Sequence, residues 1–121
     1  MPHVRQELGA AGEELAVRFL QQQGYEIIDR NWHAGRYGEI DIVAQHNSEL
    51  VMVEVKTRHG TGFGNPEEAV NKAKQEKLRA ATQAYILAHP QLPQQARIEV
   101  VAVLMSVEGK LIDLKHYRDF V

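Results

Sequence analysis

The sequence predicts a mixed α/β fold, in which helices flank a sheet that contains both parallel and antiparallel strands. Hydrophobic residues recur at helical spacing over residues 5–23 and 66–88. Two runs within residues 39–56 alternate in polarity as strands do, and residues 97–105 are apolar on both faces, which is typical of a central strand. The expected order of elements is therefore α-β-β-β-α-β.

The composition predicts a soluble, cytoplasmic protein with one domain over residues 1–121. No apolar run approaches the ~20 residues of a membrane span, and the N-terminus lacks the apolar stretch of a signal peptide. The absence of cysteine excludes disulfides and thiolate metal sites. The net charge of −2 means that any nucleic-acid site must be a local basic patch.

The first helix, over residues 5–23, ends at Gly24 as helices commonly do. Glu14 precedes Arg18 by one turn, so these two are expected to pair on the solvent side. Glu13 lies at the edge of the buried stripe and is better placed to face the sheet. The alternative is that both are first-turn glutamates, which the helix dipole favours, and that neither has a further role. The stripe consists of Leu8, Gly12, Leu15, Ala16, Phe19 and Leu20.

A first strand is expected around Tyr25 to Ile28, followed by a loop from Arg30 to Arg36. The loop is basic and contains Trp32, and such a loop can hold a nucleic-acid strand. More often a tryptophan in this position covers the edge of the core, and we favour that interpretation.

Residues 38–56, GEIDIVAQHNSELVMVEVK, predict an antiparallel hairpin with a polar turn centred on Asn47 and Ser48. Facing residues then have numbers that sum to 95, so that Val43 faces Met52. The alternation places two sets on opposite faces of the first strand: Ile40, Ile42 and Ala44 on one, and Glu39, Asp41 and Val43 on the other.

The same register brings acidic side chains together. Asp41 faces Glu54 and Glu39 faces Lys56, with facing Cβ atoms roughly 4.5–5.5 Å apart. Two facing carboxylates repel each other unless a proton or a cation lies between them, and a hard divalent cation with oxygen ligands would resolve the conflict. Lys56 lies two residues beyond Glu54 on the same face. The alternative is a structural ladder of charges on a half-exposed sheet.

A glycine-rich loop at residues 60–64 precedes the second helix, for which Asn65 is the expected N-cap. Nucleotide binding is disfavoured, because no Gly-Lys-Ser/Thr follows and Glu67 and Glu68 would repel a phosphate. The expected buried stripe of the helix consists of Val70, Ala73, Ala81, Ala84, Tyr85 and Ala88.

The second helix also carries a basic cluster, which is the best candidate for contact with backbone phosphates. Lys74 could reach the carboxylates or a phosphate; the alternative is that the lysine stems merely cover apolar surface. The residues predicted to contact nucleic acid are Lys72, Lys74, Lys77 and Arg79, together with Arg58 after the hairpin.

Beyond the second helix, residues 89–96 form a Pro/Gln-rich connection and residues 97–105 the buried strand, after which residues 111–114 predict a short fifth strand. The six histidines show no close pair and no HExxH spacing, which disfavours a zinc site. No GxSxG elbow is present, so a serine hydrolase is disfavoured as well.

Asp41, followed on the next strand by Glu54-Val55-Lys56, resembles the PD-(D/E)xK nuclease motif, with Ile40 at the loosely kept proline position. Over residues 9–105 the chain resembles the YraN family of small bacterial proteins, which are similar in outline to archaeal Holliday-junction resolvases. The segments that carry the resemblance are GEELA, GY, RNW, GEIDIVA, VEVKTR, FGNPEEAV and the late basic helix.

The resemblance implies a restriction-endonuclease-like fold and a metal-dependent endonuclease, a hydrolase acting on DNA that includes branched or single-stranded forms. It implies that Asp41, Glu54 and the Val55 carbonyl hold Mg²⁺ (or Mn²⁺) and that Lys56 positions or activates water. Glu13 would be an outer or third ligand.

The competing hypothesis is a catalytically inactive module of the same fold that binds nucleic acid or a protein. The modest basic patch and the acidic net charge favour it, whereas the set of carboxylates and Lys56 favours the enzyme. No cofactor other than the metal and no membrane partner is expected, and a homodimer is left open.

Overall fold

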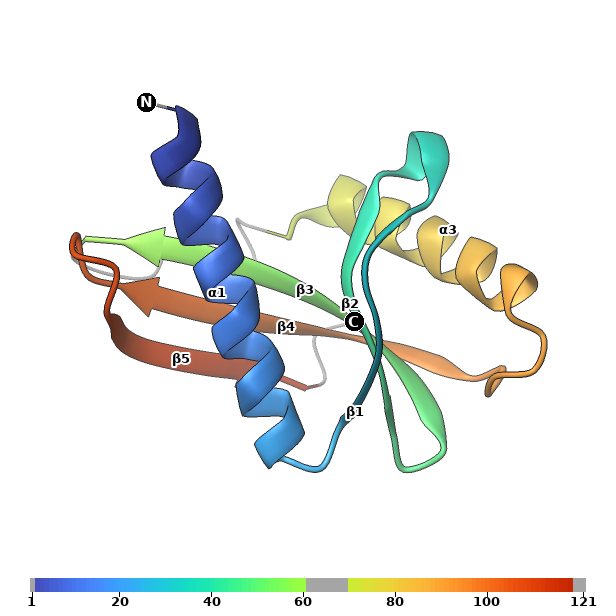
Figure 1. Cartoon of the computed structure of the whole chain (residues 1–121). Helices are drawn as coiled ribbons and strands as arrows, with labels where there is room; N and C mark the ends of the chain where they lie inside the picture. The colour runs from blue at the N-terminus through green and yellow to red at the C-terminus, as the bar shows by residue number, and fades with distance from the viewer. Residues whose placement is uncertain (1, 61–69, 119–121) are drawn as a thin grey trace.

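The computed structural model describes residues 2–60 and 70–118, and the side chains from Gly9 onward. In this part of the chain, a five-stranded sheet carries helix α1 on one face and helix α3 on the other (Figure 1). The elements are α1 (Pro2–Gln22), β1 (Glu26–His33), the short helix η1 (Gly35–Tyr37), β2 (Glu39–His46), β3 (Glu49–His59), α3 (Lys72–Ala88), β4 (Ala96–Met105) and β5 (Leu111–Tyr117).

The strands lie in the order β1-β2-β3-β4-β5, and only β3 and β4 are parallel among them. A parallel pair needs a long crossover, and α3 lies in it. The mixed sheet with flanking helices is therefore confirmed, and it is consistent with a nuclease-like core. Ile98 to Met105 are buried, which confirms that β4 is covered on both faces.

The β2–β3 hairpin keeps the predicted register, because Val43 pairs with Met52 and Ile42 with Val53. At Asp41 the predicted alternation fails. Ile40 packs in the cluster under α3, whereas Ile42 packs under α1, so these two isoleucines do not share a face. The physical reason is local: the Asp41 carboxylate accepts the Val55 N–H at 2.8 Å, so a side chain and not the strand backbone joins the two strands there.

Each helix covers its own apolar cluster. The buried residues of α1 that face the sheet are Ala16, Val17 and Leu20. On the other face, Leu78, Ala81, Thr82 and Tyr85 are buried, whereas Ala73 and Ala88, which we expected in the stripe, are exposed. The observed stripe follows the face that packs on the sheet, with Leu78, Ala81, Thr82 and Tyr85 at helical spacing.

The start of α3 corrects the second predicted helix, because Val70 and Asn71 are not helical. Asn71 is the N-cap and accepts the Lys74 N–H at 2.9 Å, which satisfies a free donor of the first turn. The expected N-cap Asn65, the glycine-rich loop after Gly60 and the glutamates at positions 67 and 68 lie outside the described residues.

Strand β1 is longer than predicted, so Arg30 to His33 belong to a strand and not to a loop. Trp32 is partly buried and packs edge-on against Tyr85, with ring centroids 5.1 Å apart. This confirms that the tryptophan covers the core edge. No helix among the described residues has both the length and the apolar character needed to cross a membrane.

Candidate metal centre

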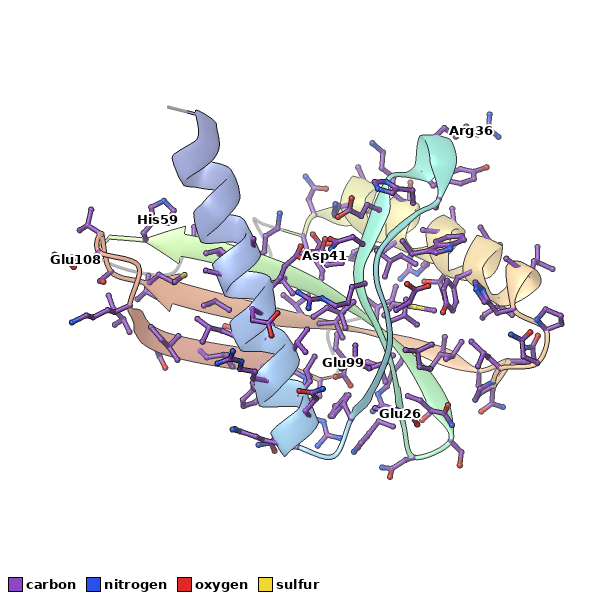
Figure 2. All side chains as sticks on the ribbon, in the orientation of Figure 1. Glu26, Arg36, Asp41, His59, Glu99 and Glu108 are labelled. Atoms are coloured by element: carbon purple, nitrogen blue, oxygen red, sulfur yellow. The ribbon has the colours of Figure 1, made fainter. Side chains whose placement is uncertain are left out.

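Three acidic side chains converge where α1 crosses the sheet. One carboxylate oxygen of each of Glu13, Glu39 and Asp41 lies within 4.8 Å of the others. Glu13 comes from α1 and the other two from β2, and Figure 2 shows Asp41 in the middle of the molecule beside α1. Glu13 therefore faces the sheet, as its place at the edge of the stripe indicated, while Glu14 pairs outward with Arg18 at 3.7 Å.

Asn31 of β1 joins this group and was missed in the sequence. With its amide nitrogen facing the carboxylates, the orientation that the surrounding acceptors assign, it donates to Glu39 at 2.8 Å and to both oxygens of Glu13 at 3.2 Å. Its backbone has a φ of 53°, a left-handed conformation that asparagine tolerates better than most residues. Because Glu39 bonds Asn31 and lies 3.6 Å from His33, its partners are on β1 and not at the predicted Lys56.

Gly12 allows α1 to approach closely enough for Glu13 to reach the sheet. A Cβ atom at position 12 would lie 2.1 Å from the Thr57 hydroxyl oxygen on β3, a distance that no real contact permits. A larger residue would push this turn of α1 away from β3 and carry Glu13 with it.

The surroundings of Asp41 fix its carboxylate in place but disfavour its charged form. Burial, together with the negative charge of Glu39, raises the pKa of Asp41 above its usual range, although the Val55 N–H, Lys74 and Lys56 act in the opposite direction. Burial and the charge of Asp41 raise the pKa of Glu13 in the same way. The site thus concentrates negative charge that the protein alone does not fully compensate.

Glu54 is the most buried of these acids. Its residue is only 4% exposed, its Oε1 lies 3.6 Å from Lys74 Nζ, and its Oε2 has no hydrogen-bond partner among the described residues. Burial first, and then the charge of Asp41, raise the pKa of Glu54 to about 7, against the opposing charges of Lys74 and Lys56. A buried acceptor without a partner costs about 1–3 kcal/mol, and more when charged, so this oxygen is a candidate ligand.

The donor set suits a hard divalent cation, because it consists of carboxylate oxygens and no thiolate or imidazole. The charge of Asp41 raises the pKa of Glu54, and the charge of Lys56, which is half-buried, lowers the pKa of both. Of the residues that the sequence predicted for the metal, Glu13 and Asp41 share one cluster with Glu39, whereas Glu54 lies outside this cluster and near Lys74. Their roles as metal ligands remain predictions.

The basic residues predicted for nucleic acid lie in three places. Lys74 turns inward to Glu54, so it belongs to the carboxylate site. Arg58 and His59 line a cavity of about 350 Å³ with Gly9 and Thr57, at the end of β3 beyond Lys56. The exposed basic residues of α3 are Lys72, Lys77 and Arg79.

A second buried polar cluster, on the other side of the sheet from Glu54, was also missed. Glu99 of β4 is fully buried and bonds Tyr25 (2.9 Å), Arg97 (2.7 Å) and His116 (2.7 Å). Arg97 also bonds Glu49 at 2.9 Å and His46 at 3.0 Å. The one available signal was an acidic residue within an apolar strand, because its partners Tyr25 and His116 are distant in the sequence.

Comparison with known proteins identifies a matching family. The model of the family described as "Uncharacterised protein family UPF0102" matches residues 12–103. This range contains Glu13, Asp41, Glu54 and Lys56, so the whole candidate site lies within the matched region.

Individual relatives are similar over most of their length. A UPF0102 protein from Rhodococcus opacus (strain B4) is 44% identical over 112 residues, which is 93% of either chain. UPF0102 proteins from Clavibacter michiganensis and Nocardia farcinica are 48% and 47% identical, over 87% and 84% of this chain and 88% and 80% of theirs.

Proposed function

The chain belongs to the UPF0102 (YraN) family, and we propose that it is a Mg²⁺- or Mn²⁺-dependent nuclease that acts on DNA. The observation that carries the proposal is the buried Glu54 carboxylate, whose Oε2 has no partner among the described residues and which lies beside Asp41. A structural ladder of charges would pair its members. This site instead leaves an acceptor oxygen free for a cation.

The residues present fit a divalent cation. Asp41, Glu54 and the Val55 carbonyl would hold it, with Glu13 as a third or outer ligand. A bound divalent ion would stabilise the negative charge that develops on a phosphate during hydrolysis. Asn31 keeps Glu13 and Glu39 in place through its amide, and the Val55 N–H fixes the Asp41 carboxylate.

Lys56 would position the attacking water and stabilise charge, because it is half-buried and its charge acts on both Asp41 and Glu54. Lys74 acts on the metal ligand and not on the water. It lies 3.6 Å from Glu54 and favours the charged form of that carboxylate, which is the form that binds metal.

DNA is the proposed substrate because exposed basic residues lie on two elements of the fold. Lys72, Lys77 and Arg79 lie on α3, and Arg58 lies at the end of β3 beside a cavity. Phosphate contacts of this kind position a nucleic acid without reading its sequence. Because the net charge is −2, binding should be local, weak and strongly dependent on salt.

One observation favours the alternative, a binding module without turnover. The Lys74 ammonium group stands 3.6 Å from Glu54, so a lysine already supplies part of the positive charge that a metal would bring. If Lys74 replaces the cation, the fold would bind nucleic acid or protein and cleave nothing.

A cleavage assay on linear, forked and four-way DNA separates the two functions. We expect cleavage by the wild type with Mg²⁺ or Mn²⁺, none with a chelator, and none by Asp41→Asn, which keeps an acceptor for the Val55 N–H. The matched control is Glu108→Gln, an acidic residue on the far turn between β4 and β5 (Figure 2). Binding without cleavage of any of these substrates by the wild type would overturn the nuclease and support the inactive module.

A further inference from the structure

The turn between β1 and β2 presents an exposed aromatic and basic pair that the carboxylate site does not use. Arg36 and Tyr37 belong to η1, which joins β1 to β2 and projects beyond the sheet (Figure 1). Figure 2 shows Arg36 at the outermost part of this turn. Tyr37 is 37% exposed, one of the large hydrophobic side chains that the described fold leaves at the surface.

The two side chains form one unit. The Arg36 guanidinium carbon lies 5.1 Å from the centre of the Tyr37 ring, and Arg36 Nη2 donates to the Tyr37 hydroxyl at 3.0 Å. A guanidinium beside an aromatic ring combines a cation with a flat apolar surface. Proteins that bind single strands use this combination, because every base has a face that can stack on an aromatic ring.

The backbone holds the pair in a fixed position. Ala34 N–H donates to the Gly38 carbonyl at 2.7 Å and Tyr37 N–H to the Ala34 carbonyl at 3.2 Å, which closes the turn. Gly35 and Gly38 have φ of 61° and 89°, which other residues rarely adopt. Ala34 packs against the cluster under α3, so the base of the turn is anchored in the core.

The turn is also joined to the candidate metal centre. His33 and Glu39 form its two ends and lie 3.6 Å apart, and Glu39 belongs to the carboxylate cluster. Asp41 follows Tyr37 by four positions, a span of at most ~13 Å along extended chain. This corresponds to about four stacked nucleotides of one strand at ~3.4 Å each.

We propose that Tyr37 and Arg36 form a subsite for an unpaired base of the DNA strand that is cut, with Tyr37 stacking on the base and Arg36 contacting its phosphate. The inference rests on the proposed function, since DNA is the ligand. Bases inside a continuous duplex are covered by their neighbours, so the subsite directs the enzyme to DNA with unpaired bases.

Fluorescence anisotropy with Ca²⁺ in place of Mg²⁺ tests the subsite through binding alone. The probes are a labelled single strand, a fork and a duplex of the same length. Tyr37→Leu and Tyr37→Ala should weaken binding to the single strand and the fork by about tenfold, because base–aromatic stacking contributes ~1–3 kcal/mol per base. Tyr37→Phe should bind as the wild type does, and no variant should change binding to the duplex.

The control is Leu87→Ala, which removes an exposed apolar side chain from α3 and should change none of these affinities. Equal binding of the single strand by Tyr37→Leu and the wild type would overturn the subsite, and so would an equal loss on the duplex. If either of these results is found while the wild type still cleaves DNA, the subsite is rejected and the nuclease proposal stays intact. Conversely, binding that depends on Tyr37 in a protein that cleaves nothing would retain the subsite and reject the nuclease.

Discussion

Glu54 and Glu99 are buried on adjacent strands, one residue apart in register, but they have opposite surroundings. Val53 pairs with Glu99 and Glu54 with Val100, so the two residues are close neighbours along the backbone of the sheet. Glu54 lies near Lys74 of α3 and Glu99 under α1, each on its own face. Both oxygens of Glu99 are hydrogen-bonded, whereas Oε2 of Glu54 has no partner among the described residues.

This difference separates a structural acid from a candidate ligand. Although burial raises it, bonds from His116, Arg97 and Tyr25 hold the pKa of Glu99 below its usual range. The pKa of Glu54 is raised to about 7. Two buried glutamates in one small sheet therefore contribute to stability with opposite dependence on pH.

Glu54→Gln should stabilise the metal-free protein at alkaline pH. Because the pKa of Glu54 rises from 4.5 to about 7 on folding, its contribution to stability is complete below pH 4.5 and is lost as the pH rises through 7. The variant should exceed the wild type by roughly 2 kcal/mol at pH 8 and lose this advantage near pH 4.5. Urea unfolding in the presence of a chelator measures this difference in the free energy of unfolding. A variant less stable than the wild type at pH 8 would indicate that Glu54 has a structural role.

Glu99→Gln should have the reverse effect. The lowered pKa of Glu99 means that its stabilisation is present above pH 4.5 and is lost as the pH falls through the folded-state value. Breaking a buried, hydrogen-bonded charge typically costs about 3–5 kcal/mol, so we expect a loss of about 3 kcal/mol at pH 7. A loss below about 1 kcal/mol in the same urea experiment would contradict the structural role.

Gly12→Ala should weaken both the fold and the site, because its Cβ would lie 2.1 Å from Thr57 Oγ1. We expect a loss of about 1–3 kcal/mol from overpacking and weaker Mn²⁺ binding as Glu13 moves away. Adding Thr57→Ala removes the hydroxyl and methyl that clash and should restore part of both. If Gly12→Ala binds Mn²⁺ as tightly as the wild type, then Glu13 is not a ligand.

Lys72→Glu with Lys77→Glu should weaken binding to all DNA sequences alike and reduce its salt dependence, because phosphate contacts release counterions without reading bases. Lys74 is a poor choice for this test, since it pairs with Glu54. Binding measured from low to high salt gives the number of contacts. An unchanged salt slope would place the nucleic-acid surface elsewhere.

Much of the fold follows from local patterns. Period-two alternation and the polar turn at Asn47 and Ser48 predicted the hairpin register, which Val43 and Met52 confirm. The double-sided apolar run predicted β4, and helical spacing predicted α1. These signals are strong because they arise within a few residues of each other.

The parts that could not be predicted depend on contacts between distant segments. The break at Asp41 arises because its side chain takes the Val55 N–H, and Asn31 enters the site only through the shape of β1. Two partners of Glu99 are distant in the sequence, Tyr25 by 74 residues and His116 by 17. Alternation along one strand contains no information about such partners.

Calorimetric titration with Mn²⁺ in buffers of different ionisation enthalpy tests the central claim most directly, since it counts protons released as metal binds. Because the pKa of Glu54 is about 7 and a ligand must be deprotonated, Glu54 of the wild type should release about 0.8 proton at pH 6.5 and almost none at pH 8.5. Glu54→Gln should bind more weakly and release fewer protons, and Glu108→Gln should match the wild type. Absence of Mn²⁺ binding by the wild type, or binding with no proton release at pH 6.5, would contradict Glu54 as a metal ligand.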